Sequence, residues 1–236
     1  AAKGIPSTAA ITPIQFCEKY CQYVDEGYTD VIHVPINRSG SSTYNNAVMA
    51  QGMLREERPE HHLNIHLLDP HTYSMVFGWY LCEMARKLQN GAELRHVISE
   101  FETQMNKMEV ILGPYSLKQM KKSGRISAAA AVMGELMGIR PIITLIDGKT
   151  RVESKVRGDD KVIPAMIDLC KKRTEGVEDF DYMIGHTSIP QAAELEKACR
   201  KAFGKAPLST FNLGGVVSAN TGPDTLALVY VGKPRD

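Results

Sequence analysis

Arg125 and the serine-rich segment around Ser41 are the residues whose types best suit chemistry on an anion. Arg125 follows Gly124 at the start of "GRISAAAAVMGELMGIRPIITLIDG". A fully buried, unpaired guanidinium is costly, so we expect Arg125 at an exposed or cleft-facing turn. There its fork of donors could hold a carboxylate or a phosphate. The small residues 128–131 permit tight helix packing or a narrow channel beside the helix, but they do not account for the charge.

The segment "NRSGSSTYNN" lies between a predicted strand and a predicted helix. In an open α/β sheet, ligands bind beyond the carboxyl ends of the strands. A helix N-terminus there offers free N–H groups and a partial positive charge, and Ser41, Ser42 and Thr43 add hydroxyl donors. The pattern therefore suits a carboxylate or a phosphate. The alternative is that these side chains only cap the helix.

Other motifs that would indicate an enzyme or a metal site are missing from the sequence. The serine-rich segment is neither a Walker loop nor a GxSxG elbow, which disfavours a nucleotide-binding enzyme. His61, His62 and His66 lack a metal-ligand spacing, so we predict surface histidines and no metal. His33 lies within a strand pattern and is predicted to be a core or pocket residue.

Composition excludes several further classes of protein. Hydrophobic residues make up 43% of the 236 residues and the net charge is +1, so a core is expected and a basic field for nucleic acid is not. The longest apolar runs are too short to span a bilayer. Five cysteines without a CxxC pair favour reduced thiols and a cytoplasmic location. The sequence starts without a methionine, and we expect the natural chain to begin earlier.

The first part of the chain alternates helices with apolar strands, which predicts a parallel-sheet α/β domain over residues 1–104. A helix over residues 13–26 is indicated by Phe16, Tyr20 and Val24, with Thr12 as its N-cap. The other predicted elements of this domain are strands 30–36 and 63–68 and helices 43–57, 74–89 and 92–107.

The second part, residues 105–236, is predicted to be a mixed α/β domain. Asp147-Gly148 joins two apolar runs and is a strong hairpin signal. The helices are predicted at 116–122, 160–172 and 190–203. The remaining strands are predicted at 108–113, 181–186, 208–215 and 225–232. Two polar loops, "PSTAAITP" (residues 6–13) and "SANTGPDT" (residues 218–225), are further candidates for holding a ligand.

Four motifs of the chain resemble those of the DegV family. They are "PSTAAITPIQF", "INRSGSSTYNNA", "LKQMKKSGRISAAAAVMGELMGIRPIITLIDG" and "SANTGPDTLAL", and their order runs across nearly the whole chain. The Gly-Arg-Ile-Ser block in the third motif is the most specific. By this resemblance the chain is identified as a member of the DegV family.

The resemblance implies a two-domain α/β protein that holds one long-chain fatty acid between its domains, without a cofactor and without being an enzyme itself. It also implies a partner, a separate fatty acid kinase that makes an acyl phosphate for phospholipid synthesis. Thr8 and Ser41 fall at family positions that contact the carboxylate, and Arg125 falls near the head group. The predicted ligand-binding residues are Thr8, Ser41, Ser42, Arg125, Asn220 and Thr221.

The sequence departs from the family pattern in ways that bear on function. Ser42 replaces a glycine, and Asn220 stands where the family has a histidine. Since Asn carries no charge, we expect Arg125 to be the only fixed positive charge among the motif residues at the site. Its alternative role is an ion pair across the domain interface. A different class of function is a serine hydrolase that uses Ser41 on an acyl ester, with His33 as the only nearby candidate base.

Overall fold

The computed structural model of the protein describes residues 6–127 and 138–234. Contacts divide it into two compact units, of which the smaller is Ala9–Tyr73 and the larger is built from the residues before Ala9 and after Tyr73. The predicted fold class is confirmed, because a parallel sheet is followed by a larger mixed sheet. The smaller unit ends at Tyr73 and the larger unit resumes at Ser74. The predicted domain boundary after residue 104 stays a prediction.

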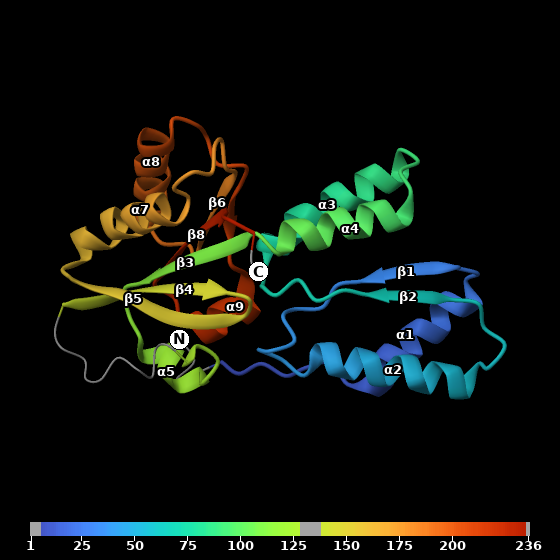
Figure 1. Ribbon diagram of the computed structural model, residues 1–236. Coiled ribbons are helices and arrows are strands. Elements are labelled where there is room, and N and C mark those ends of the chain that lie inside the picture. The colour runs from blue at the N-terminus through green and yellow to red at the C-terminus, as the bar shows by residue number, and fades with distance from the viewer. Residues whose placement is uncertain (1–5, 128–137, 235–236) are drawn as a thin grey trace. The chain divides into compact units, whose positions relative to one another are not determined.

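The smaller unit is a β–α–β arrangement preceded by a helix. Helix α1 (Pro13–Asp25) precedes strand β1 (Asp30–His33), and helix α2 (Thr43–Glu57) joins β1 to strand β2 (Asn64–Leu67). The two strands pair in parallel. Both helices lie on the same side of the strands (Figure 1), which is where the small core forms.

Local chemistry fixes the start of α1. The Gln15 N–H donates to Thr12 Oγ1 at 3.3 Å, and the Thr12 N–H donates to Gln15 Oε1 at 3.0 Å, which makes a capping box. Pro13 occupies the first turn, where its missing N–H is not needed. The predicted N-cap is therefore confirmed. The buried residues that α1 and α2 pack together are Phe16, Cys17, Tyr20, Cys21, Ala47, Ala50 and Leu54.

The larger unit begins with a helical hairpin, formed by α3 (Met75–Gln89) and α4 (Leu94–Met105). The chain reverses at Asn90-Gly91, where Gly91 has a φ of 85° that favours glycine. Glu93 caps α4, because its carboxylate accepts hydrogen bonds from two N–H groups of the first turn.

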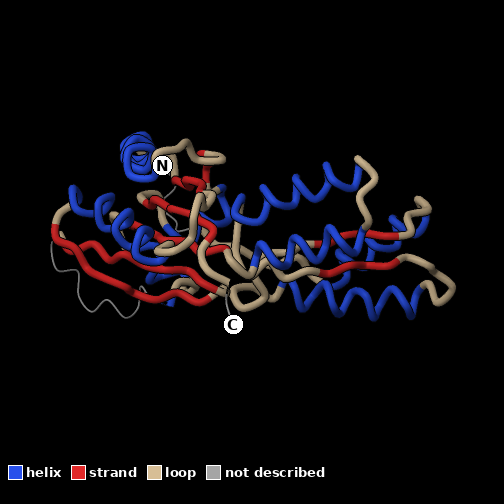
Figure 2. Tube along the Cα trace, turned by 45° about the horizontal axis from the view of Figure 1, so that its top comes forward, coloured by secondary structure: helices blue, strands red, loops and turns tan. Residues whose placement is uncertain are grey.

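A mixed sheet of six strands forms the centre of the larger unit, and strands are red in Figure 2. The strand order is β5-β4-β3-β8-β6-β7, and β6–β7 is its parallel pair. The strands are β3 (Met108–Pro114), β4 (Ile139–Ile146), β5 (Lys149–Arg157), β6 (Tyr182–His186), β7 (Thr210–Asn212) and β8 (Thr225–Val231). The predicted hairpin is confirmed at Asp147 and Gly148, which both have positive φ, as a tight two-residue turn requires.

Two helices cover this sheet and form the larger core. They are α7 (Val162–Arg173), which follows a short 3-10 turn η1 (Asp159–Lys161), and α8 (Gln191–Phe203). A short helix α5 (Lys118–Ser123) lies beside α9 (Gly214–Thr221), away from α7 and α8 (Figure 1).

Beneath α7, a buried carboxylate is fully paired. Glu109 on β3 accepts hydrogen bonds from Arg173 Nε at 2.5 Å and Nη2 at 3.1 Å. The Tyr230 hydroxyl donates to the same carboxylate at 2.6 Å. Since Glu109 is only 6% exposed, these three donors offset the cost of burying its charge.

Helix α9 corrects the prediction for residues 208–225. The predicted strand 208–215 is limited to β7, and the first half of the predicted loop "SANTGPDT" belongs to α9. The strand cannot continue because Gly214 adopts a φ of 79° and its N–H turns back to Asn212 Oδ1 at 3.0 Å. A bond from Gln119 on α5 to the Ala219 carbonyl oxygen then holds the helix in place.

Candidate functional site

Two polar loops meet at the carboxyl ends of β1 and β2. Residues 34–42 follow β1 and residues 68–74 follow β2, and both lie at one edge because the strands are parallel. The Asn37 N–H donates to the Thr72 carbonyl oxygen at 3.1 Å, and Asn37 Nδ2 donates to the Tyr73 hydroxyl at 3.2 Å. Asn37 is fully buried, so it fixes the two loops to each other.

Asn37 also shapes the turn that leads to α2. Its Oδ1 accepts from the Ser39 N–H at 2.9 Å, and its carbonyl oxygen accepts from the Gly40 N–H at 3.1 Å. A Cβ atom on residue 40 would collide with the ring and hydroxyl of Tyr73. Glycine at position 40 therefore lets the two loops approach closely.

The hydroxyl groups of the predicted site lie at the start of α2. Ser41 Oγ is 2.7 Å from Thr43 Oγ1 and accepts from the Thr43 N–H at 3.2 Å, so it satisfies part of the helix end as the capping alternative expects. Ser42 occupies the N-cap position, but its exposed side chain makes no capping bond. The Ser42 hydroxyl is thus a donor open to an anion at this helix N-terminus.

The same loops carry charges that sequence reasoning missed. The Arg38 N–H donates to Asp69 Oδ1 at 3.4 Å, and Arg38 Nε lies 3.8 Å from Asp69 Oδ2. The Asp69 side chain is 8% exposed, whereas that of Arg38 is 62% exposed and extends over the Tyr44 ring. Arg38 is thus a second arginine within the quoted motifs, and the expectation that Arg125 is the only fixed positive charge at the site stays a prediction. The signal was the arginine of "NRSG" itself, inside the quoted motif.

The other predicted ligand residues belong to the larger unit. Thr8 is exposed. Arg125 is also exposed and follows Gly124, whose φ of 66° ends α5. Its N–H donates to Ser123 Oγ at 3.3 Å, and its guanidinium has no ion-pair partner among the described residues of the larger unit. The predicted exposure of Arg125 is confirmed, and its alternative role, an ion pair across the domain interface, stays a prediction.

Asn220 and Thr221 end α9, next to the helix that precedes Arg125. Asn220 Nδ2 donates to the Val216 carbonyl oxygen at 2.8 Å, and its side chain is half-buried. Thr221 is buried, and its carbonyl oxygen accepts from Thr225 Oγ1 at 3.1 Å. Because α5 and α9 lie side by side, the structure brings together the elements that carry Arg125, Asn220 and Thr221.

The apolar segment after Arg125 is described only in part. The small residues 128–131 lie outside the described residues. Further along, β4 places Ile142 in the core with α7 and α8. That side chain is buried and packs the larger core.

The hydrolase alternative needs a histidine beside Ser41. In the described ranges, Ser41 Oγ bonds to Thr43 and to no histidine. His33 Nδ1 lies 2.6 Å from the Tyr20 hydroxyl, with the Phe16 ring edge-on at 4.9 Å between centroids. Burial lowers the pKa of His33. His33 is thus a half-buried residue with a satisfied ring nitrogen, in line with the predicted core or pocket residue.

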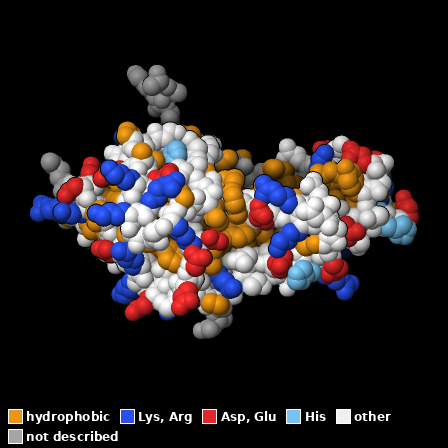
Figure 3. Space-filling model, turned by 90° about the horizontal axis from the view of Figure 1, so that it is seen from above, with side chains coloured by type: hydrophobic (Ala, Val, Ile, Leu, Met, Phe, Trp, Pro, Cys, Tyr) orange, Lys and Arg blue, Asp and Glu red, His pale blue; other side chains and the backbone are white. Residues whose placement is uncertain are grey.

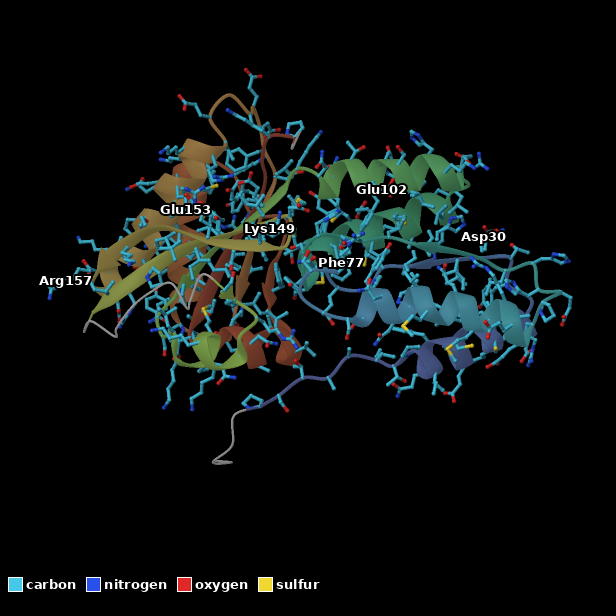
Figure 4. The ribbon with its side chains drawn as sticks, turned by 60° about the horizontal axis from the view of Figure 1, so that its bottom comes forward. Asp30, Phe77, Glu102, Lys149, Glu153 and Arg157 are labelled. Atoms are coloured by element: carbon cyan, nitrogen blue, oxygen red, sulfur yellow. The ribbon has the colours of Figure 1, made fainter. Side chains whose placement is uncertain are left out.

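Of the remaining histidines of the smaller unit, His61 and His62 precede β2 and His66 lies within it, whereas His71 lies in the polar loop after β2. His66 Nε2 is 2.8 Å from a carboxylate oxygen of Asp30, the first residue of β1, which is labelled in Figure 4. A surface pocket of ≈ 740 Å³ is lined there by residues of α2 and by His61, His62 and His66. The pocket lies beside β2 and the residues that precede it, and none of its lining residues belongs to the polar loops.

Two further features concern the surface charge and the helices. On the face drawn in Figure 3, Lys and Arg side chains are interspersed with Asp and Glu, without a broad field of one sign among the described residues. Over the described ranges, no helix combines the length and the apolar character needed to span a bilayer.

Comparison with known proteins decides the family. Residues 1–233 match the family model described as an uncharacterised protein of the DegV family. The chain belongs to the DegV family. A DegV domain-containing protein of Staphylococcus aureus is 30% identical over 240 residues, which cover 98% of this chain and 79% of that protein.

Solved structures of DegV proteins have the same fold. A fatty acid binding DegV family protein of Streptococcus agalactiae is 25% identical, with a TM-score of 0.83 over 99% of this chain and 81% of that chain. A stearic acid-binding protein of Eubacterium ventriosum is 21% identical, with a TM-score of 0.86 over 98% of this chain and 80% of that chain. The second match supports the DegV fold alone.

Proposed function

We propose that this DegV chain binds one long-chain fatty acid and carries it without converting it chemically. The observation that supports this most is the whole-chain match to the Streptococcus agalactiae protein described as binding a fatty acid. The polar loops after β1 and β2 add a physical reason, because they present hydroxyl and N–H donors at a helix N-terminus.

The residues proposed to contact the head group occur in both units. In the smaller unit, Ser41 and Ser42 contribute hydroxyls beside the first turn of α2. In the larger unit, exposed Arg125 contributes a charge that is unpaired among the described residues of that unit. The full proposed set is Thr8, Ser41, Ser42, Arg125, Asn220 and Thr221.

The acyl tail supplies most of the proposed affinity. Burying roughly fourteen CH₂ groups at ~0.8 kcal/mol each contributes about 11 kcal/mol before any cost. Immobilising a flexible chain reduces that substantially. The carboxylate contacts then orient the ligand and discriminate against uncharged lipids.

We further propose that the bound fatty acid is presented to a separate fatty acid kinase, which forms the acyl phosphate. An exposed arginine suits this role, because an acyl phosphate carries more negative charge than a carboxylate. At the position of Asn220 the family has a histidine, which can carry a positive charge. Asparagine cannot, so Arg125 and Arg38 remain as fixed positive charges.

Calorimetric titration with palmitate and with methyl palmitate tests the binding proposal. Ser41→Ala is expected to weaken palmitate binding by about 1–3 kcal/mol, the range for a hydrogen bond to a charged group. Binding of the methyl ester should be nearly unchanged. Equal losses for acid and ester would show that Ser41 only caps α2, and no binding of palmitate by the unmodified chain would refute the proposal.

A further inference from the structure

Three groups with metal-binding atoms converge between α1 and α2, away from the polar loops. The thiols of Cys17 and Cys21 and a carboxylate oxygen of Glu57 all lie within 4.8 Å of one another. Cys21 Sγ is 3.5 Å from Glu57 Oε2. We refer to these three residues as the dithiol–carboxylate cluster.

The fold explains why the cluster forms. Cys17 and Cys21 are four residues apart on α1, so their side chains lie on one face of the helix. Glu57 is the last residue of α2, which packs along α1. Cys17 is 1% exposed and Cys21 8% exposed, whereas Glu57 is exposed. The cluster therefore has a buried sulfur side and an open carboxylate side.

This donor set selects a particular class of ion. Thiolates favour thiophilic cations such as Zn²⁺, whereas Mg²⁺ and Ca²⁺ prefer oxygen ligands throughout. Zn²⁺ accepts sulfur and carboxylate ligands in tetrahedral geometry. Three protein donors and one water on the open side complete such a coordination shell.

We propose that Cys17, Cys21 and Glu57 bind one zinc ion, which joins the middle of α1 to the C-terminal end of α2. On binding, two Zn–S bonds and one Zn–O bond form, and the two thiol protons pass to solvent. No electron is transferred. The site is independent of fatty-acid binding, since the rise of α2 places Glu57 about 20 Å from the polar loops at the other end of that helix.

Buried cysteines are often only small apolar residues, and the chain provides a comparison for this alternative. Cys170 and Cys199 are both buried in the larger core. They belong to no group of three metal-binding donors in the described ranges. The proposed site differs from that pair because an exposed carboxylate lies beside its two thiols.

Titration of the reduced full chain with Cd²⁺ tests the proposal, because Cd²⁺ is a thiophilic probe for a zinc site and its bonds to thiolates absorb in the ultraviolet. The unmodified chain should develop this absorption at one ion per chain. Zn²⁺ should compete it away and raise the melting temperature. Cys17→Ser and Cys21→Ser should each abolish the absorption, whereas Cys82→Ser, which alters an exposed cysteine, should retain it.

Glu57→Gln keeps the test decisive even if a core cysteine variant does not fold. This substitution is on the surface, and it should lower Cd²⁺ affinity at least about tenfold. Glu56→Gln, at the exposed neighbouring position, is the matched control and should bind like the unmodified chain. The proposal is overturned if the unmodified chain shows no cadmium–thiolate absorption, if both serine variants retain it, or if Glu57→Gln and Glu56→Gln bind equally.

Discussion

The Tyr73 hydroxyl occupies the space where a side chain at position 40 would begin. A Cβ atom built on Gly40 meets the hydroxyl and the ring carbon that bears it, and Asn37 Nδ2 donates to that same hydroxyl at 3.2 Å. Gly40 and Tyr73 lie on different polar loops. The two residues are 33 positions apart in the sequence (73 − 40). Their contact sets how closely the loops can approach.

Gly40→Ala should therefore displace Tyr73 and break the loop connection. We expect a lower free energy of unfolding, of about 1–3 kcal/mol as for other overpacked sites, together with weaker fatty-acid binding. Urea denaturation and calorimetric titration measure the two effects. Tyr73→Phe in the Gly40→Ala background removes the atom that collides most severely and should recover part of the stability.

Gly52→Ala is the matched control for this substitution. Gly52 lies within α2, and a Cβ there meets nothing within 4 Å. Replacing a helical glycine by alanine should stabilise the chain by roughly 0.5–1 kcal/mol. If Gly40→Ala behaves like Gly52→Ala, the close approach of the two loops is not required.

Arg125→Ala should separate a functional role from a structural one. The guanidinium is exposed and unpaired among the described residues of the larger unit, so the melting temperature should stay unchanged. Fatty-acid binding should fall modestly, and kinase-dependent phosphorylation should fall strongly, because an acyl phosphate carries more charge than a carboxylate. Lys122→Ala, at an exposed position on α5, is the control. An Arg125→Ala protein that melts much earlier, yet is phosphorylated normally while folded, would make Arg125 structural.

Arg173→Met should destabilise the larger unit, because it leaves the buried Glu109 carboxylate with the Tyr230 hydroxyl alone. Removing one partner of a buried ion pair typically costs about 3–5 kcal/mol. Arg200→Met is the control, since the Arg200–Glu196 pair has side chains that are 51% and 28% exposed and should contribute at most about 1 kcal/mol. Guanidinium denaturation followed by circular dichroism compares the two, and equal losses would refute the role assigned to Glu109.

The stability of the smaller unit should fall in mild acid because of His33. Burial lowers the pKa of His33 below its ordinary value of 6.5, so below that pH the unfolded chain binds the proton more readily than the folded chain. This contribution to stability is present above about pH 6.5 and is lost as the pH falls toward the pKa of the folded state. Urea denaturation between neutral and mildly acidic pH should show a smaller pH dependence for His33→Gln, and an identical dependence would contradict the assignment.

Much of the fold could be predicted where short-range signals agree. Thr12 and Gln15 carry a capping pattern, and Asp147-Gly148 carries a turn pattern, and both are confirmed. Helix α9 could not be predicted in this way. Its sequence "GGVVSANT" combines glycine with β-branched residues, which are poor helix formers, and a contact from Gln119 on α5 holds it.

The candidate site was predictable in part for the same reason. Ser41 and Ser42 precede a helix in the sequence, so their place at its first turn follows from local pattern. The bonds that hold this turn come from Thr72 and Tyr73, on a loop more than thirty positions away. Such contacts depend on the parallel pairing of β1 and β2 and leave no signal in either loop alone.

Native mass spectrometry of the purified chain, followed by solvent extraction, measures whether the chain carries a fatty acid. We expect an added mass of one long-chain fatty acid per chain, released as the free acid on extraction. A chain stripped of lipid should regain that mass when oleate or palmitate is added. A purified chain without bound fatty acid, which also fails to take up added oleate and palmitate, would contradict the proposal that this chain binds a fatty acid.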